Sequence, residues 1–199
     1  NPPYKTKASD IEEFEFILNN LDALEPGGTC IAIIPISCVI EKSMTATNLR
    51  KRVLEKHTLE AVLSMPEELF HNSKVNTVTC TVIITAHKPH PKGKKTWFAY
   101  CRDDGFIKVK NKGRIDAKHT WDEIRERWVT AYRNREIIDG FSFMREVTEK
   151  DEWCVEAYLE TDYDKLSFED YEDTVKRFLM FHLMNMSGLI GEGEESEDL

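Results

Sequence analysis

No hydrophobic run in this 199-residue sequence is long enough to cross a membrane. The longest apolar stretch, residues 30–40, falls well short of the roughly 20 residues that a transmembrane helix needs. No basic segment followed by an apolar one precedes it, so we expect no secretion signal in these residues, although the absence of a starting Met leaves room for an earlier leader. The composition, with 41% hydrophobic and 32% charged residues, is typical of a soluble globular chain without membrane association.

Cysteine pairs and metal-ligand spacings are also absent. The five cysteines are odd in number and no C-x-x-C occurs, which argues against a zinc knuckle and favours a reducing cytoplasm. Cys30 and Cys80 lie in apolar runs, where a thiol behaves as a small core residue. His87 and His90 stand close together in HKPHP, but no further ligands cluster with them. We therefore expect no bound metal.

Positive charge is scarce overall. The chain has 27 Lys and Arg against 36 Asp and Glu, a net charge of −9 that argues against nucleic-acid binding by bulk electrostatics. The distribution is uneven: residues 88–118 hold ten basic and three acidic residues, whereas residues 141–199 hold five basic and seventeen acidic residues. One basic segment could thus meet phosphates, while the acidic end would avoid them or face a protein.

Residues 9–28 predict a helix with defined ends. Asp10 is the expected N-cap, with Glu13 three residues later, and Pro26-Gly27-Gly28 ends the helix. One apolar stripe follows the helical period. Its members are Ile11, Phe14, Leu18 and Leu21.

Strands and helices then alternate. Residues 29–35 are apolar at nearly every position, which is typical of a central parallel strand covered on both faces. Residues 43–57 predict a helix capped by Ser43, and residues 58–63 and 75–85 predict two strands. This order predicts an α/β layer whose last strand is antiparallel, because only a loop separates it from its predecessor.

The second half predicts a hairpin and three helices. Residues 95–101 and 106–110 are the expected hairpin strands, with Asp104-Gly105 in the turn. The helices are expected to begin at a capping box of Thr120 and Glu123, at Thr148, and at Ser167 with Asp170. We therefore divide the chain into residues 1–90, a basic hairpin at 91–118, a helical region at 119–190, and a flexible acidic tail at 191–199.

The first four residues, Asn-Pro-Pro-Tyr, form a stiff motif. Each proline fixes φ near about −65° and pushes the residue before it to extended geometry. Asn1 Oδ1 and the Pro2 carbonyl can therefore each accept one N–H of a planar amine whose ring stacks on Tyr4. Held in this way, the amine directs its lone pair toward a methyl donor, and positioning carries the rate without a strong base.

A proline-rich turn without chemistry would show the same four letters. The context favours a site, because an amphipathic helix, a Gly-Gly stop and an apolar strand follow at once. This order places the motif at the C-terminal end of a parallel strand, where open α/β sheets bind their ligands.

Several motifs in order along the chain carry a resemblance: NPPY, LEPGGTCIAIIP, LRKRVLEKHTLEAVLSMPEELF and NTVTCTVIIT, with DDGF and GRID further on. Together they resemble the C-terminal half of an S-adenosylmethionine-dependent N6-adenine DNA methyltransferase, similar to the modification subunit of type I restriction-modification systems. The resemblance covers about residues 1–120 well and the helical remainder more loosely. It implies the C-terminal half of a Rossmann-like sheet that transfers a methyl group to adenine N6 in double-stranded DNA.

Residue by residue, the resemblance implies that Asn1, Pro2 and Pro3 form the catalytic motif with Tyr4, which stacks on an adenine flipped out of the duplex. It implies that Phe70 closes the other face of the base, with a simple core anchor as an equal alternative. The Gly-rich donor-binding turn of the family is absent upstream, and HNSKVNT follows Phe70 where relatives often have a Gly-containing loop. We therefore expect an inactive fragment without bound S-adenosylmethionine.

Basic residues alternate with aromatic and aliphatic ones in the predicted hairpin. A solvated face is one interpretation, and sequence-independent contact with DNA phosphates beside the target base is the other. The expected phosphate contacts are Lys94, Lys95, Lys108, Lys110, Lys112 and Arg114.

The resemblance also implies protein partners. Similar modification subunits need a separate specificity subunit to choose the DNA sequence, and a restriction subunit is a further candidate. The acidic helical end is the expected docking surface. In a fragment, the strand at 29–35 lacks a neighbour, and its apolar edge predicts a dimer.

Two other functions stay open. NPPY also occurs in enzymes that methylate glutamine amides of translation release factors, and related forms act on RNA bases, because any planar amide or amine fits the two acceptors. The chain could instead be an interaction fragment without catalysis.

Overall fold

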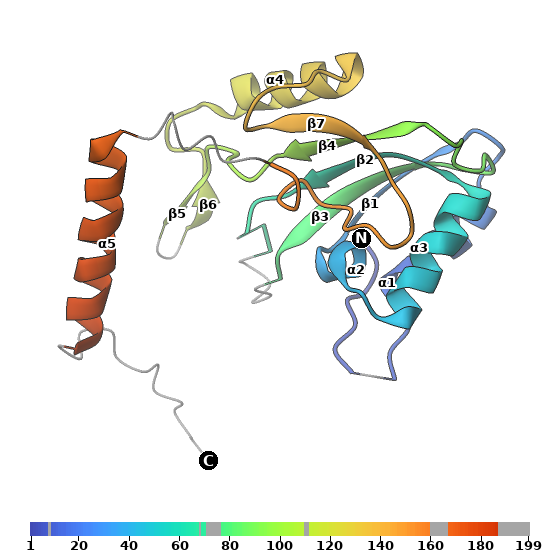
Figure 1. Cartoon of the computed structure of the whole chain (residues 1–199), viewed down its shortest axis with the longest axis horizontal. Coiled ribbons are helices and arrows are strands. Elements are labelled where there is room, and N and C mark those ends of the chain that lie inside the picture. The colour runs from blue at the N-terminus through green and yellow to red at the C-terminus, as the bar shows by residue number, and fades with distance from the viewer. Residues whose placement is uncertain (8, 68, 71–76, 110–111, 160–166, 187–199) are drawn as a thin grey trace. The chain divides into compact units, whose positions relative to one another are not determined.

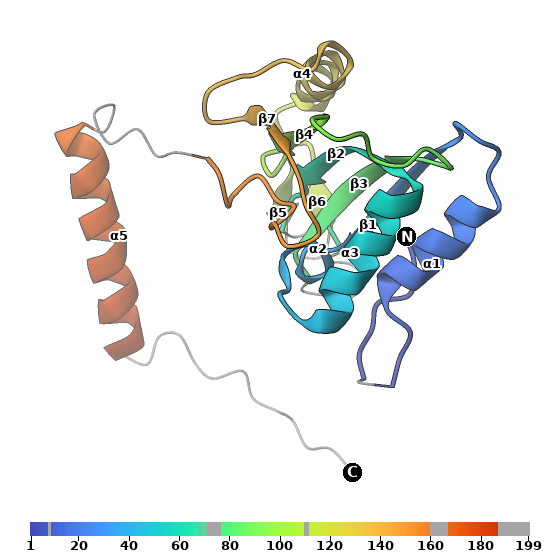
Figure 2. The ribbon, with the colours of Figure 1, turned by 45° about the vertical axis from the view of Figure 1, so that its right-hand side comes forward.

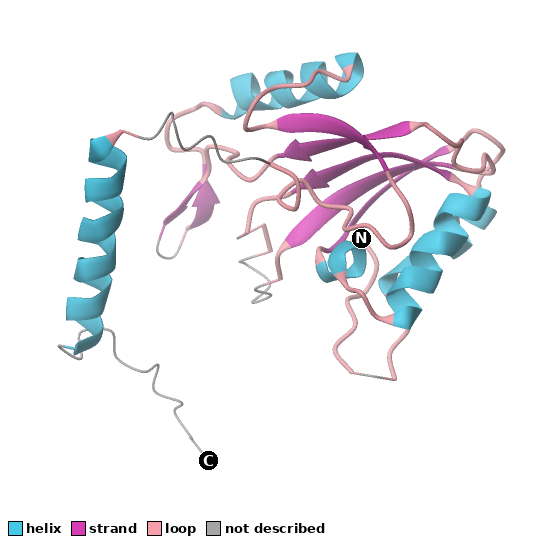
Figure 3. Cartoon of the chain, viewed as in Figure 1, coloured by secondary structure: helices cyan, strands magenta, loops and turns pink. Residues whose placement is uncertain are grey.

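The computed structural model describes residues 1–7, 9–67, 69–70, 77–109, 112–159 and 167–186. The chain divides into two units, residues 1–159 and 160–199. The first unit holds the sheets and four of the labelled helices, and the second holds α5 (Phe168–Met186) (Figures 1 and 3). Within the described residues, no helix combines the length and the apolar character that a membrane span requires.

Five strands of the first unit form a mixed sheet in the order β1-β3-β2-β4-β7. β3 lies antiparallel between β1 and β2, so β1 and β2 run in the same direction, and β2 pairs in parallel with β4. The carboxyl ends of β1, β2 and β4 therefore meet at one edge, which we call the carboxyl edge (Figure 1). The strands are β1 (Thr29–Pro35), β2 (Thr58–Ser64), β3 (Thr79–Thr85), β4 (Lys95–Tyr100) and β7 (Ser142–Glu146).

This architecture confirms the α/β class and the antiparallel last strand of the first half. The position of β1 differs from the expectation of a central strand covered on both faces. Within the described chain β1 pairs only with β3, and Ile31 is 66% exposed while Ala32 and Ile34 on the opposite face are buried. β1 is thus an edge strand with one covered face, and its unpaired edge is the one that the sequence predicted.

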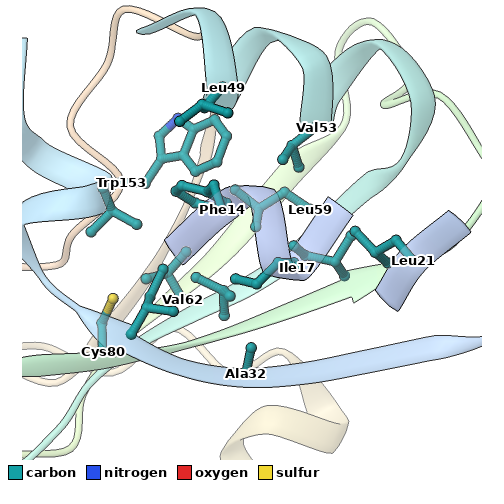
Figure 4. Packing of buried hydrophobic residues seen from close by; sticks show 14 of the residues in the cluster. Phe14, Ile17, Leu21, Ala32, Leu49, Val53, Leu59, Val62, Cys80 and Trp153 are labelled. Atoms are coloured by element: carbon teal, nitrogen blue, oxygen red, sulfur yellow. The ribbon is translucent and has the colours of Figure 1, made fainter. Parts of the chain in front are cut away.

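Helices cover both faces of the sheet. α1 (Glu13–Asp22) and α3 (Met44–Lys56) lie side by side on one face (Figure 2), with the short α2 (Ser37–Ile40) after β1. Their apolar side chains meet those of the strands in a core that also receives Trp153 (Figure 4). α4 (Trp121–Asn134) covers the other face, where Ala131 packs with Trp97.

The predicted helix ends are partly right. The Ser43 hydroxyl caps α3 by accepting the N–H of Ala46 at 3.2 Å, as expected. Asp10 does not cap α1, because its carboxylate accepts the N–H groups of Thr6 and Lys7 instead. Ile11 lies before the helix and is 59% exposed, so it does not belong to the buried stripe.

Helix α4 is confirmed, but its predicted capping box is wrong. The Thr120 side chain makes no capping hydrogen bond. The Asp116 carboxylate accepts the backbone N–H groups of Thr120 and Trp121 at 3.0 and 3.1 Å instead. Asp116 therefore satisfies two of the unpaired donors at the helix start, which is the function of a cap.

The predicted hairpin of residues 95–101 and 106–110 is wrong in its pairing. β4 joins the main sheet between β2 and β7. The sequence patterns did not predict β7 as a strand. The observed hairpin pairs β5 (Ile107–Val109) with β6 (Gly113–Ile115).

The helix predicted from Thr148 is also absent. Residues 147–159 form turns and irregular structure, and the Thr148 N–H and hydroxyl both donate to Asp151 Oδ2. The third predicted helix is confirmed as α5, and the acidic tail at 191–199 lies outside the described residues.

Candidate functional site

Tyr4 of the Asn-Pro-Pro-Tyr motif lies at the carboxyl edge of the sheet. Tyr4 lines a cavity of about 430 Å³ together with Pro35 and Ser37 at the end of β1 and Thr77 before β3. Asn1 and Pro3 are exposed, and Pro2 and Tyr4 are half-buried. The motif is thus partly open to solvent, and its Tyr4 lies beside the end of β1, at the edge where α/β sheets place their ligands.

The Tyr4 side chain points its hydroxyl into the protein. The hydroxyl oxygen is buried and has no hydrogen-bond partner among the described residues. Burial raises the pKa of Tyr4 to about 12, with further contributions from the acidic groups of Cys80, Cys38 and Glu13. Tyr4 is therefore a neutral phenol at physiological pH, and its ring, rather than its hydroxyl, is the part available to a ligand.

Phe70 lies against Tyr4, although the sequence places the two rings far apart. Their centroids are 5.8 Å apart and their planes are at 89°, an edge-to-face contact. Phe70 is half-buried. The structure thus brings together the two aromatics proposed to sandwich a base, and their perpendicular planes leave no parallel slot between them.

Glu13, which the sequence patterns predict only as a helix-start residue, is buried beside the motif. It is 4% exposed, and its Oε1 accepts the N–H of Lys5 at 2.7 Å. Its Oε2 accepts the thiol hydrogen of Cys38, with 3.4 Å between sulfur and oxygen. One signal was present in the sequence: Glu13 stands four residues before Ile17 and eight before Leu21, on the buried stripe of α1.

Arg50 of α3 stabilises the segment that follows β1 and lines the cavity. This residue is 1% exposed, and its guanidinium donates to the carbonyl oxygens of Cys38, Glu41 and Glu149 at 3.2, 2.9 and 2.9 Å. The guanidinium carbon also lies 5.8 Å from the ring centroid of Trp153. The three carbonyl acceptors compensate for the cost of burying this positive charge. Because they come from α2 and its surroundings and from Glu149, the Arg50 side chain fixes α2 against residues 149–153.

The described members of the six predicted phosphate contacts do not form one surface. Lys94 and Lys95 stand at the amino end of β4, at the edge of the sheet opposite the motif, and Lys94 pairs with Glu60 at 3.0 Å. The Arg114 guanidinium pairs with Asp104 at 2.7 Å. This placement is a correction to the expectation that all six lie beside the target base.

Lys108 and Lys112 are exposed on the β5–β6 hairpin. Lys108 lies in β5 and Lys112 directly before β6, and the hairpin follows the carboxyl end of β4 (Figure 1). The sixth residue, Lys110, lies outside the described residues.

The histidines of HKPHP contact backbone oxygens. His87 Nε2 lies 2.9 Å from the Leu24 carbonyl, and His90 Nε2 lies 3.3 Å from the Lys94 carbonyl. Within the part of the chain that the structure describes, no group of three or more His, Cys, Asp or Glu side chains could hold a metal ion.

Fold and geometry together define an α/β domain with a candidate ligand site at the carboxyl edge of its parallel strands. The family model for N-6 DNA Methylase matches residues 2–182, and the chain belongs to this family.

A curated relative and two solved structures are similar to the chain. It is 30% identical over 207 residues to the type II restriction enzyme and methyltransferase RM.BcgI of Heyndrickxia coagulans, an alignment that covers 100% of this chain and 32% of the relative. The chain therefore spans about a third of the length of that protein.

The two solved structures share the fold at low identity. The first is the type I restriction-modification system methyltransferase subunit from Streptococcus thermophilus, with a TM-score of 0.57, 22% identity, and coverage of 74% of this chain and 30% of that one. The second comes from a study of complex assembly and conformational transition of the type I R-M system, with a TM-score of 0.58, 17% identity, and coverage of 94% and 41%.

Proposed function

We propose that residues 1–199 form the target-base half of a DNA adenine N6-methyltransferase in a restriction-modification system. The observation that carries the proposal is the position of Tyr4, the last residue of Asn-Pro-Pro-Tyr, at the carboxyl edge, where its ring contacts Phe70. Membership of the N-6 DNA Methylase family and the likeness to RM.BcgI support it.

In this proposal the motif binds and orients the amine of a flipped adenine. Asn1 Oδ1 and the Pro2 carbonyl each accept one N–H, and the adenine ring stacks on Tyr4. The amine lone pair is then directed at the place where S-adenosylmethionine would supply its methyl group. The N–C bond would form as the methyl–sulfur bond breaks, the sulfonium would leave as a neutral thioether, and the extra proton on the amine would leave to water. No described side chain has to act as a strong base, because the proton departs only after the nitrogen has become cationic.

S-adenosylmethionine would supply the methyl group as a sulfonium. The described residues fit the acceptor side of this chemistry, with carbonyl oxygens and aromatic rings at the motif. We propose that the donor is bound by a part of the enzyme beyond residues 1–199, next to the unpaired edge of β1, and that residues 1–199 alone bind it weakly or not at all.

We further propose double-stranded DNA, a specificity subunit and a restriction subunit as partners, in the cytoplasm. The second unit supports a protein partner, because α5 carries a row of exposed apolar side chains at helical spacing. They are Phe168, Tyr171, Val175, Phe178 and Leu179.

A methyl-transfer assay tests the proposal. The full-length protein that contains these residues is incubated with labelled S-adenosylmethionine and one of three acceptors: a mixed-sequence DNA duplex, an RNA, or a peptide with the glutamine-containing loop of a release factor. Label on adenine N6 of the duplex is the expected result. Label on the peptide or on RNA alone would assign the motif to another substrate, and no transfer to any of them would favour an interaction role.

A further inference from the structure

We propose that Glu13 is a positioning residue that holds the Asn-Pro-Pro-Tyr motif in its working geometry. The inference rests on the proposed function and adds to it a residue outside the motif. Glu13 does not touch the substrate in this account. It acts through the backbone that follows Tyr4.

The contact between Glu13 and the motif is short and shielded from water. Glu13 Oε1 accepts the N–H of Lys5 at 2.7 Å, and Lys5 follows Tyr4 directly. The carboxylate is 4% exposed, so water does not compete well for this hydrogen bond. The Lys5 ammonium pairs with Glu12 at the surface, where an ion pair fixes little. Glu13 is thus a buried anchor of the backbone directly after Tyr4.

Glu13 is itself anchored to the end of β1. Its Oε2 accepts the Cys38 thiol, and the Cys38 carbonyl accepts a hydrogen bond from the buried Arg50 at 3.2 Å. Glu13 is also the first residue of α1, where the helix dipole favours a negative charge. The side chain therefore ties the motif to α1 and, through α2, to the tip of β1.

The position of Glu13 argues for a specific role. It occupies the buried stripe of α1 with Ile17 and Leu21, where an apolar side chain of similar size would be at least as stabilising. The carboxylate at this place has two visible uses: the Lys5 N–H and the Cys38 thiol. Of these, the Lys5 N–H belongs to the residue directly after Tyr4, whose ring is proposed to stack on the base. A small displacement of a group that orients the substrate lowers the catalytic rate strongly.

A pair of substitutions in the full-length enzyme tests the inference. Glu13→Gln keeps the length of the side chain and an oxygen acceptor, whereas Glu13→Asp keeps the charge but withdraws it from Lys5. Positioning predicts that Glu13→Gln retains most of kcat, while Glu13→Asp lowers kcat by about tenfold to a hundredfold with little change in KM for S-adenosylmethionine. Glu15→Asp is the matched control, since Glu15 lies on the same helix and pairs with Arg52.

Hydrogen exchange of the Lys5 amide gives a readout that does not depend on methyl transfer. The amide is expected to exchange about tenfold faster in Glu13→Asp than in the parent or in Glu13→Gln. Unchanged exchange, or a kcat that Glu13→Asp preserves better than Glu13→Gln, would overturn the inference. If the parent transfers no methyl group while Lys5 exchange still depends on Glu13, the proposed function fails and the catalytic role falls with it, although the contact itself is verified.

Discussion

Tyr4 and Phe70 meet edge to face at the carboxyl edge of the sheet, with 5.8 Å between their ring centroids. Such pairs are favourable in themselves, because the positive edge of one ring meets the negative face of the other. The perpendicular planes leave no parallel slot for a base between the two rings. Entry of an adenine between them is therefore expected to displace Phe70 or turn its ring.

Tyr4→Phe is expected to stabilise the protein while it preserves the stacking surface. The Tyr4 hydroxyl is buried without a partner among the described residues, so its removal should raise the free energy of unfolding by about 1 kcal/mol. Urea unfolding monitored by circular dichroism measures the change. A loss of stability in Tyr4→Phe would show that the hydroxyl is satisfied in solution.

Tyr4→Phe is also expected to change how the free energy of unfolding depends on pH in the alkaline range. The pKa of Tyr4 is raised from 10.0 to about 12, so folding favours the neutral phenol. The contribution of Tyr4 to stability is therefore fully present below pH 10 and is lost as the pH rises toward 12. Unfolding of the parent and of Tyr4→Phe, compared across this range, should diverge in favour of the variant. Parallel curves would contradict the raised pKa.

Arg50→Ala is expected to lower the free energy of unfolding by about 3–5 kcal/mol. The change leaves the carbonyl oxygens of Cys38, Glu41 and Glu149 without their donor and opens a space beside Trp153. Chemical denaturation measures the loss. Arg52→Ala, on the same helix but at the surface, is the control and should cost at most about 1 kcal/mol. Equal losses in the two variants would contradict the account.

Much of the fold was readable from local patterns. The Thr/Val/Ile alternation of β3 and the Ser43 cap of α3 are short-range signals, and both elements form as predicted. β7 was missed because Phe143 and Met144 lie in a segment too short to show a period. The prediction that residues 95–101 pair with residues 106–110 was wrong for a different reason. β4 pairs with β2 and β7, which lie far from it in the sequence, and local patterns do not reveal such long-range pairing.

The predicted DNA-binding lysines separate into two groups. Replacing Lys108 and Lys112 with Gln should lower the salt slope of DNA binding by the full-length enzyme by about 0.9 for each phosphate that is no longer neutralised. Replacing Lys94 and Lys95 with Gln should leave the slope unchanged, because they stand at the opposite edge of the sheet. Fluorescence anisotropy at several salt concentrations measures both, and equal slopes for the two double variants would contradict this division.

Residues 1–199 alone are expected to dimerise through β1. The outer edge of this strand is unpaired in the described chain, and its Ile31 side chain is 66% exposed. Small-angle scattering of the isolated chain should report a dimer, and Ile31→Lys should give a monomer. Ile11→Lys is the control, because Ile11 is similarly exposed but lies outside the sheet. A parent that stays monomeric at high concentration would contradict the prediction.

The candidate site was only partly predictable from the sequence. The acceptor geometry of Asn1 and Pro2 follows from proline stereochemistry, which is local. The contact between Glu13 and Lys5 depends on how α1 returns to the motif, and no pattern within the motif encodes it. The separation of Lys94 from the hairpin lysines likewise follows from the parallel pairing of β4, which places its first residues at the far edge.

The most direct test of the account is the rate of methyl transfer to adenine N6 by the full-length enzyme carrying Asn1→Ala. Loss of one of the two acceptors that orient the amine should lower kcat by about a hundredfold to a thousandfold, with S-adenosylmethionine binding unchanged. A variant that forms N6-methyladenine at the parental rate would show that the motif at the carboxyl edge does not hold the target base.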